Sequence, residues 1–383
     1  MEANERNETR AQKRRRIREE IKSSRVARLG DGNPLVTVVV CVIALLALTG
    51  CIVLIMELRH WQQNAEVTTM EAEDHVPHGG GDERTPSELD EPVIDTVVFP
   101  LDDGEDYSAA AALVELKERL MAGEDLSAIL RAVYVNDVVV GADGRFHFFP
   151  IDENLAMHEY DTERFVLDDR GILSYQDEDG NVLSRKGIDV SRYQLDIDWE
   201  KVAADGVEFA IIRLGFRGSS EGGLFIDPYY EANIEGALAN GIDVGVYFFT
   251  QALNVEEAIE EAEFVLLHIG EYDLAYPVVI DIEMIETANP RTRNMTQDEW
   301  TEVAIAFCEH IIAAGYTPMI YGNLRSFMLM LDISRLEAYE RWFAFFRTPI
   351  YFPYQHSIWQ YTDRGQVDGI EGPVDLNIGF WQP

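Results

Sequence analysis

The stretch from Tyr276 to Glu283 constrains the fold of this chain more than any other. It reads YPVVIDIE, an apolar and β-branched run that ends in two acids two positions apart. A short apolar run of this kind predicts a buried parallel strand. Because strand side chains alternate between faces, Asp281 and Glu283 should point the same way. Two crowded, desolvated carboxyls would raise the pKa of at least one of them, which suits a general acid. The plain alternative is a solvated pair just beyond a strand end.

Residues 187–383 alternate between strand and helix patterns, and this predicts an α/β domain. Five strand–helix units are followed by three strands without a long helix between them. Eight strands close a parallel-type barrel, so we expect an irregular (β/α)5(β)3 barrel of the TIM type with its site at the carboxyl ends of the strands. The expected strands lie at 187–190, 208–214, 244–249, 276–283, 319–321, 342–346, 356–361 and 374–380. The expected helices follow Asp198 and Asp227, the capping pairs Asn254/Glu257 and Thr296/Glu299, and Asn323.

The segment 35–56 predicts a transmembrane helix. It holds 22 residues without a charge, enough to span a hydrocarbon core of about 30 Å. Residues 1–34 carry 10 Lys/Arg against 6 Asp/Glu and give a basic tail, whereas acidic residues follow the apolar run. The positive-inside rule then places the tail in the cytoplasm and the body outside the cell membrane. Two alternatives are a lipoprotein signal ending at Cys51 and a cleaved signal peptide, and both also export the body.

Two further segments separate this helix from the barrel. Residues 57–107 are acidic, contain Pro and a Gly79–Gly81 run, and predict an extended linker. Residues 108–186 predict a small α+β spacer module with helices to about 134, a hairpin across 141–144 and a second turn at 177–181. Beyond residue 34 the net charge is −42, which excludes nucleic acid as a partner. With three Cys and scattered His, we expect no disulfide framework and no metal-ligand cluster.

Acids at the ends of several strands should converge on one mouth of the barrel. They are Asp189, Asp281, Glu283 and Asp375. Polar and aromatic residues at comparable heights are the candidate substrate contacts, namely Tyr247, Tyr321, Trp359, Gln360, Tyr361 and Arg213. Carboxyls with aromatic platforms suit glycoside hydrolysis, which needs one acid to protonate the leaving oxygen and a second carboxylate. Each residue alone has a structural explanation as a cap, a strand-end acid or core. Together the four acids indicate a site.

Four motifs resemble family 25 of the glycoside hydrolases, the bacterial and phage lysozymes. They are GIDVSRYQ at 187–194, VIDIE at 279–283, IWQYT at 358–362 and VDLN at 374–377. The resemblance covers about 187–383. It implies an N-acetylmuramidase that cuts the β-1,4 bond between N-acetylmuramic acid and N-acetylglucosamine in peptidoglycan. It also implies Glu283 as general acid, Asp281 as its assistant, and Asp189 and Asp375 as the rest of an acidic floor, with Tyr247, Tyr321 and Gln360 on the sugar. The resemblance implies no cofactor.

These observations lead to one main hypothesis and two alternatives. The main hypothesis is a membrane-anchored enzyme that remodels or turns over the cell's own wall, with peptidoglycan strands and the membrane, through residues 35–56, as partners. One alternative is a non-catalytic glycan-binding or wall-anchoring protein on a degenerate barrel. The other is a different glycosidase, such as a chitinase.

Overall fold

The computed structural model describes residues 114, 116–270, 272–285, 287 and 289–380. The predicted tail at 1–34, the transmembrane helix at 35–56 and the linker at 57–107 lie outside these residues, as does the start of the predicted helix at 108. Within the described part of the chain, no helix is both long and apolar enough to cross a membrane.

Eight strands form a closed barrel, as the sequence predicts. In chain order they are β5 (Arg185–Val190), β6 (Phe209–Arg217), β8 (Asp243–Phe249), β9 (Val278–Asp281), β10 (Pro318–Asn323), β11 (Glu340–Ala344), β12 (Ile358–Gly365) and β13 (Val374–Gly379). Neighbours pair in this order, and β5 closes the ring by pairing with both β6 and β13. The short β7 (Leu224–Ile226) pairs only with the end of β6.

The last strand departs from the parallel arrangement that we predicted. β13 is antiparallel to both β12 and β5, whereas the other barrel pairs are parallel. Only residues 366–373 connect β12 to β13, and a parallel connection needs a crossover of a dozen or more residues. The start of β13 therefore lies at the same barrel end as the carboxyl ends of the other strands, which brings Asp375 to the mouth.

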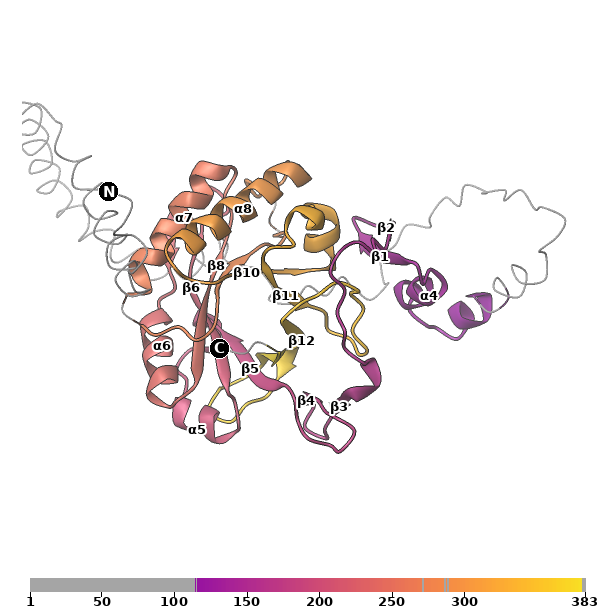
Figure 1. Cartoon of the computed structure of the whole chain (residues 1–383), viewed down its shortest axis with the longest axis horizontal. Coiled ribbons are helices and arrows are strands. Elements are labelled where there is room, and N and C mark those ends of the chain that lie inside the picture. Colours follow the sequence, from indigo (N-terminus) through magenta and orange to yellow (C-terminus); the bar gives the residue numbers. More distant parts are fainter. Residues whose placement is uncertain (1–113, 115, 271, 286, 288, 381–383) are drawn as a thin grey trace, which may run out of the picture.

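Helices cover one side of the barrel (Figure 1). They are α5 (Trp199–Ala204), α6 (Tyr230–Ala239), α7 (Val255–His268) and α8 (Gln297–Ala313). The capping box of α8 is confirmed, because the Thr296 side chain accepts from the Glu299 amide and Glu299 accepts from the Thr296 amide. In α7 only half of the predicted box forms: Asn254 caps the helix, but the Glu257 carboxylate accepts from Leu253, one residue before the cap. The predicted fifth helix from Asn323 is instead a π-helical turn, η4 (Ser326–Met330), followed by a 3-10 turn, η5 (Ile333–Arg335).

The amino-terminal end of the barrel is plugged by two stacked rings. Phe209 and Tyr276 lie parallel with their centroids 4.4 Å apart, and Arg185 donates to the Tyr276 hydroxyl. Glycine is needed beside this plug, because a Cβ on Gly187 would lie 2.1 Å from the Phe209 ring. The interior is therefore closed by ring packing at this end, and a substrate can be reached only from the opposite end.

The module before the barrel contains the hairpin and the turn that the sequence predicts. α4 (Leu126–Val133) precedes the antiparallel pair β1 (Asp137–Ala142) and β2 (Arg145–Pro150). A break precedes α4, where Gly123 has φ of 82° and Asp125 is the N-cap. A second pair, β3 (Phe165–Leu167) and β4 (Leu173–Tyr175), follows the short η2 (Thr162–Arg164). A bridge between Gln176 and Val182 closes the turn at 177–181.

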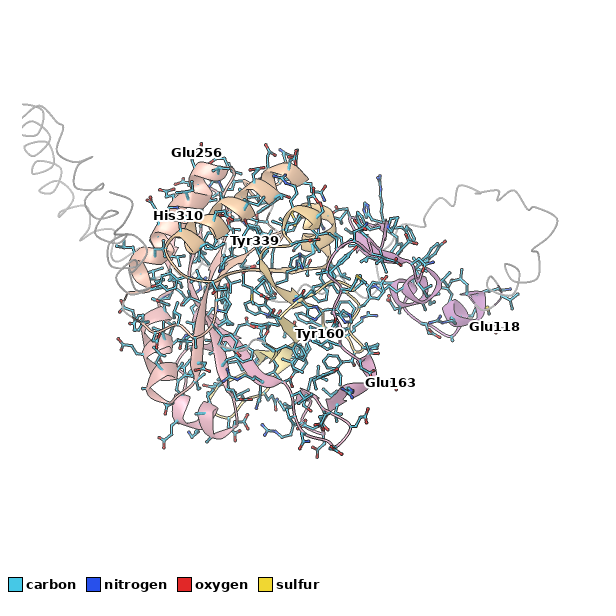
Figure 2. All side chains as sticks on the ribbon, in the orientation of Figure 1. Glu118, Tyr160, Glu163, Glu256, His310 and Tyr339 are labelled. Carbon is cyan, nitrogen blue, oxygen red and sulfur yellow. The ribbon has the colours of Figure 1, made fainter. Side chains whose placement is uncertain are left out.

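This module covers the strands that no long helix follows. Its residues share one continuous hydrophobic core with the barrel. The Phe165 ring meets Trp359 edge-on at 5.3 Å, and Tyr160 stacks on Phe380 at 4.1 Å. Figure 2 shows Tyr160 at the junction between module and barrel. The module is therefore packed into the outer wall of the barrel, across the predicted boundary at residue 187, and takes the place of the missing helices.

Candidate active site

The four predicted acids meet at the mouth of the barrel. Asp281 ends β9 and Glu283 follows two residues later, while Asp189 and Asp375 come from β5 and β13. The antiparallel register places Asp375 directly opposite Asp189. All four side chains belong to residues that are at most 5% exposed. Four carboxyls in so little solvent cannot all be ionised at neutral pH, because desolvation and mutual repulsion both favour the protonated form.

A fixed set of hydrogen bonds holds Asp189 in place. Its Oδ2 accepts from Gln360 Nε2 and from Asn377 Nδ2, each at 2.8 Å. The Tyr321 hydroxyl donates to Gln360 Oε1 at 2.8 Å, and the Trp342 indole donates to Asn377 Oδ1 at 2.8 Å. Both amides are thus oriented with their N–H groups toward the carboxylate. Within this cluster, these two donors stabilise the ionised form of Asp189.

The surroundings separate the pKa values of the acids. Burial raises the pKa of Asp189 to about 6, against the lowering effect of the Asn377 and Gln360 hydrogen bonds. Burial raises the pKa of Glu283 to about 7, with the Asp189 charge adding to it and the Tyr321 hydroxyl opposing it. The pKa values of Asp281 and Asp375 are raised well above the usual range, first by burial and then by neighbouring carboxylates. Glu283 therefore keeps a proton close to neutral pH while Asp189 loses its own.

Three polar atoms in the mouth have no partner within the described chain. They are Asp281 Oδ1, Asp375 Oδ1 and the Tyr247 hydroxyl oxygen. A buried polar atom without a hydrogen bond costs about 1–3 kcal/mol, so native proteins rarely leave several together. Their grouping at the mouth of the barrel indicates that a polar ligand provides their hydrogen bonds.

Arg213 joins the site from β6, where it is the register partner of Tyr247. Its Nε donates to Asp227 Oδ2 at 2.7 Å, and both side chains are almost fully buried. The guanidinium lies 5.3 Å from the centre of the Tyr193 ring, which is 41% exposed. The positive charge lowers the pKa of Asp281 against the larger effect of burial. Arg213 is thus held close to the acids by a carboxylate and an aromatic ring.

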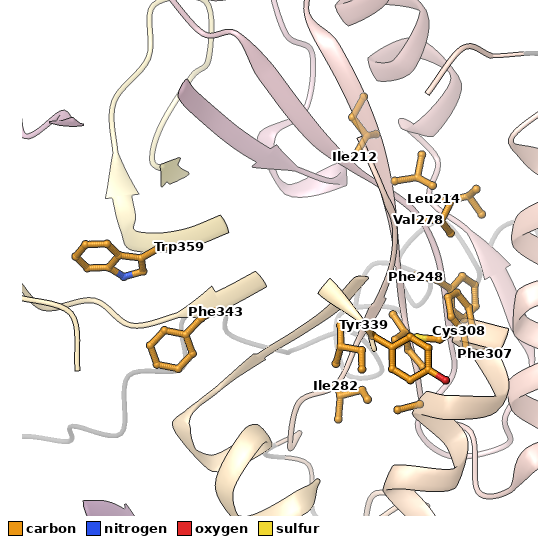
Figure 3. Packing of buried hydrophobic residues seen from close by; sticks show 14 of the residues in the cluster. Ile212, Leu214, Phe248, Val278, Ile282, Phe307, Cys308, Tyr339, Phe343 and Trp359 are labelled. Carbon is orange, nitrogen blue, oxygen red and sulfur yellow. The ribbon is translucent and has the colours of Figure 1, made fainter. Parts of the chain in front are cut away.

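Trp359 and Tyr361 do not share the mouth, and this corrects their prediction as substrate contacts. Gln360 points inward, so alternation turns its two neighbours outward. Trp359 donates to Phe345 O at 2.8 Å, and the Tyr361 hydroxyl accepts from the Leu173 amide. Figure 3 shows Trp359 beside Phe343, its register partner, in the outer core. Tyr247, Tyr321, Gln360 and Arg213 all face the interior.

Four residues of the site escaped the sequence analysis, and two of them carried a signal. Asn377 lies two positions after Asp375 and so shares its face, and Trp342 begins a predicted strand. Asp227, named only as a helix start, and Tyr193, inside the motif at 187–194, gave no signal of contact with Arg213, because only the fold brings them to it. Among the described residues, no three His, Cys, Asp or Glu side chains are arranged to hold a metal ion.

Comparison with known proteins agrees with this geometry. Residues 188–370 match the model of the glycosyl hydrolases family 25. That stretch is similar to family 25 of the glycoside hydrolases and spans just under half of the chain. The chain is an enzyme of the glycoside hydrolase class, and this match supports the resemblance of its motifs to the family.

Individual relatives are distant and match about half of this chain. An uncharacterised protein YegX of Escherichia coli K12 is 29% identical over 195 residues, which are 50% of this chain and 68% of YegX. An autolytic lysozyme of Clostridium acetobutylicum is 25% identical over 193 residues, 50% of this chain and 55% of that protein. The structure of the modular autolysin LytC from Streptococcus pneumoniae aligns with a TM-score of 0.48 at 25% identity, covering 63% of this chain and 57% of LytC.

Proposed function

We propose that this glycoside hydrolase is a muramidase that cleaves the β-1,4 bond between N-acetylmuramic acid and N-acetylglucosamine in peptidoglycan. The observation that carries the proposal is Glu283, a buried acid with a pKa of about 7 among three other carboxyls. The family 25 match and a relative named as an autolytic lysozyme support the choice of substrate. The three unpartnered oxygens at the mouth suit a ligand rich in hydroxyl and amide groups.

Glu283 acts as the general acid in this proposal. Its proton passes to the oxygen of the leaving N-acetylglucosamine as the bond from that oxygen to the anomeric carbon breaks. Water then supplies hydroxide to the anomeric carbon, and its remaining proton returns to the Glu283 carboxylate. Burial provides both properties that this role needs, because it holds the proton on Glu283 near neutral pH and strengthens the developing interaction with the leaving oxygen.

Asp281 is the natural partner of the reacting sugar. Its Oδ1 has no hydrogen bond within the described chain, and Arg213 lowers its pKa against burial. Its free oxygen accepts a hydrogen bond from the 2-acetamido N–H, which turns the acetamido oxygen toward the anomeric carbon. If Asp281 instead stabilises positive charge there directly, it must first lose the proton that burial and the neighbouring carboxylates favour. Asp189 and Asp375 form the floor beneath, and Asp189 adds to the pKa of Glu283 through its charge.

We propose further that the enzyme is held at the outer face of the cell membrane. The support is the uncharged segment 35–56, preceded by a basic tail and followed by an acidic stretch. An anchored muramidase reaches only nearby glycan, which suits remodelling or turnover of the cell's own wall. Protease treatment of intact and of permeabilised cells tests the topology. Cleavage of the barrel in intact cells supports it, and protection until permeabilisation contradicts it.

Mass spectrometry of the fragments released from purified peptidoglycan tests the activity. The full chain should be used, because the barrel shares its core with the preceding module. Fragments that end in reducing N-acetylmuramic acid are expected. The Glu283→Gln variant should release them about 10²- to 10⁴-fold more slowly, the usual contribution of a general acid, whereas Glu153→Gln on an exposed turn should match the wild type.

Other fragment patterns would redirect the proposal. Fragments that end in N-acetylglucosamine would support a glycosidase but contradict the proposed bond specificity. Cleavage of chitin oligomers alone would contradict the proposed substrate. No fragments from a folded full chain would favour a binding protein. Equal rates for the wild type and Glu283→Gln would remove Glu283 from its role.

A further inference from the structure

A groove of about 770 Å³ lies outside the acid cluster and contains none of the site residues described above. It runs between the turn at 168–171 and the loop at 366–373 that joins β12 to β13. A groove of this size falls in the range of small-ligand sites. Its lining is mostly polar and charged. The lining residues are Asp169, Arg170, Arg364, Gln366, Val367, Asp368, Ile370, Gly372 and Pro373.

Hydrogen bonds fix the backbone conformation of both walls of the groove. On one side, Asp168 Oδ1 accepts from the amides of Arg170 and Ile172 at 2.9 and 2.7 Å. On the other, Gly369 O accepts from the Asp198 amide at the start of α5. Gly369 has φ of 100°, and a Cβ there would lie 2.4 Å from Asp198 O, so this contact requires glycine. The groove is therefore preformed, which lowers the entropy cost of binding.

The charges in the groove have both signs. Arg364 is exposed, and its Nε lies 3.6 Å from Asp363 Oδ1. The Arg170 Nη2 donates to Asp205 Oδ1 at 2.7 Å, and half of its side chain is open to solvent. Asp169 and Asp368 are exposed carboxylates on opposite walls. Such a site suits a ligand with carboxylate and ammonium groups together, as a short peptide has, rather than a neutral sugar.

The groove also adjoins the acidic floor along the chain. Pro373 lies in its wall, and Asp375 of the acidic floor follows two residues later. Asp363, the partner of Arg364, is close enough to Asp375 for its charge to raise the pKa of that acid, after the larger effect of burial and the charge of Asp189. The groove and the acidic floor are therefore linked through the short segment 373–375 and through the charge of Asp363.

We propose that this groove binds the peptide branches that N-acetylmuramic acid carries in peptidoglycan. The inference rests on the proposed muramidase function and adds a specificity to it. Carboxylates of the branch bind Arg170 and Arg364, and the side-chain amine of its diamino residue binds Asp169 and Asp368. The enzyme then favours strands that still carry their peptides over strands from which the peptides have been removed.

The test compares two substrates with the same glycan. Peptide-bearing strands and strands stripped by an amidase are digested by the full chain, by the double variant Arg170→Gln/Arg364→Gln, and by Arg145→Gln as a control on the exposed face of β2. The ratio of kcat/KM on peptide-bearing to stripped strands is the readout. Two exposed ion pairs are weak, so we expect this ratio to fall about three- to tenfold in the double variant and to stay at the wild-type value in the control. It should also fall with added salt.

Failure of the inference is distinct from failure of the proposed function. If the wild type cleaves both strands with equal kcat/KM, or if the double variant keeps the wild-type ratio, the groove does not bind the peptide. If neither strand is cleaved, the muramidase proposal fails. In that case a direct measurement of peptide binding tests whether the groove binds the peptide. Fluorescence anisotropy of a labelled L-Ala-γ-D-Glu-L-Lys peptide on the Glu283→Gln chain should show weaker binding once the two arginines are replaced. Equal binding would overturn the inference.

Discussion

Asp375 lies directly across the β5–β13 pair from Asp189, so two carboxyls face each other on neighbouring strands. Like charges opposite one another destabilise a sheet, and the barrel accepts this arrangement where its strands meet the mouth. The two acids are not equivalent. Gln360 and Asn377 donate to Asp189, whereas Asp375 Oδ1 has no partner within the described chain. The pair therefore holds one negative charge more readily than two.

Replacing Asp189 by Asn should make Glu283 a stronger acid. The Asp189 charge raises the pKa of Glu283, so its removal should shift the basic limb of the kcat/KM profile from about pH 7 to lower pH. The rate should also fall at every pH, because the floor of the site has changed. A pH profile on purified peptidoglycan measures both effects, with Asp196→Asn on an exposed loop as the control. A basic limb that stays in place would show that burial alone sets the Glu283 pKa.

Replacing Gln360 by Met should shift the acidic limb of the kcat/KM profile against pH. Gln360 donates to Asp189 Oδ2 and so favours the anion. Without that donor the pKa of Asp189 should rise above about 6, and activity should be lost at a higher pH on acidification. Gln355→Met, at an exposed position, serves as the control. If the acidic limb is the same in both variants, ionised Asp189 is not required for the reaction.

Much of the barrel could be predicted because its signals are local. A cap such as Thr296 and the period-two pattern at Asp281 and Glu283 depend on a few neighbouring residues. The same local rule, applied to the strand that contains Gln360, would have turned Trp359 and Tyr361 away from the mouth. The direction of β13 did not follow in this way, because the predicted strands left residues 362–373 between them, enough for a parallel crossover, and only the structure extends β12 to Gly365.

Other features depend on contacts between distant residues, and no local pattern encodes them. The Phe165 ring packs on Trp359, far along the chain, and Arg213 meets Asp227 only because β6 and the start of α6 are brought together. The predicted helix after Asn323 became a π-helical turn whose Ser326, Phe327, Met328 and Met330 are buried. Tertiary packing there outweighs helix propensity.

The buried acid that serves the reaction should also reduce the stability of the fold. The folded-state pKa of Glu283, about 7, exceeds its usual value of 4.5. Its contribution is therefore fully present below pH 4.5 and is lost as the pH rises through 7. The loss amounts to about 3 kcal/mol as an order of magnitude. Glu283→Gln should raise the melting temperature at pH 8 by several degrees and change it little at pH 4. Calorimetry at both values measures this, and an equal effect at the two pH values would contradict the argument.

Removal of the module should unfold or weaken the barrel. A chain that starts at residue 187 lacks Tyr160 and Phe165, which cover Phe380 and Trp359. Leu173, whose amide donates to the Tyr361 hydroxyl, is also lost. Exposing large apolar side chains costs about 1.5–3 kcal/mol each, and total stability is only about 5–15 kcal/mol. We expect a lower urea midpoint and binding of a hydrophobic dye, compared with a chain that starts at residue 116. Equal midpoints would mean that the barrel folds independently and that the module is only attached to it.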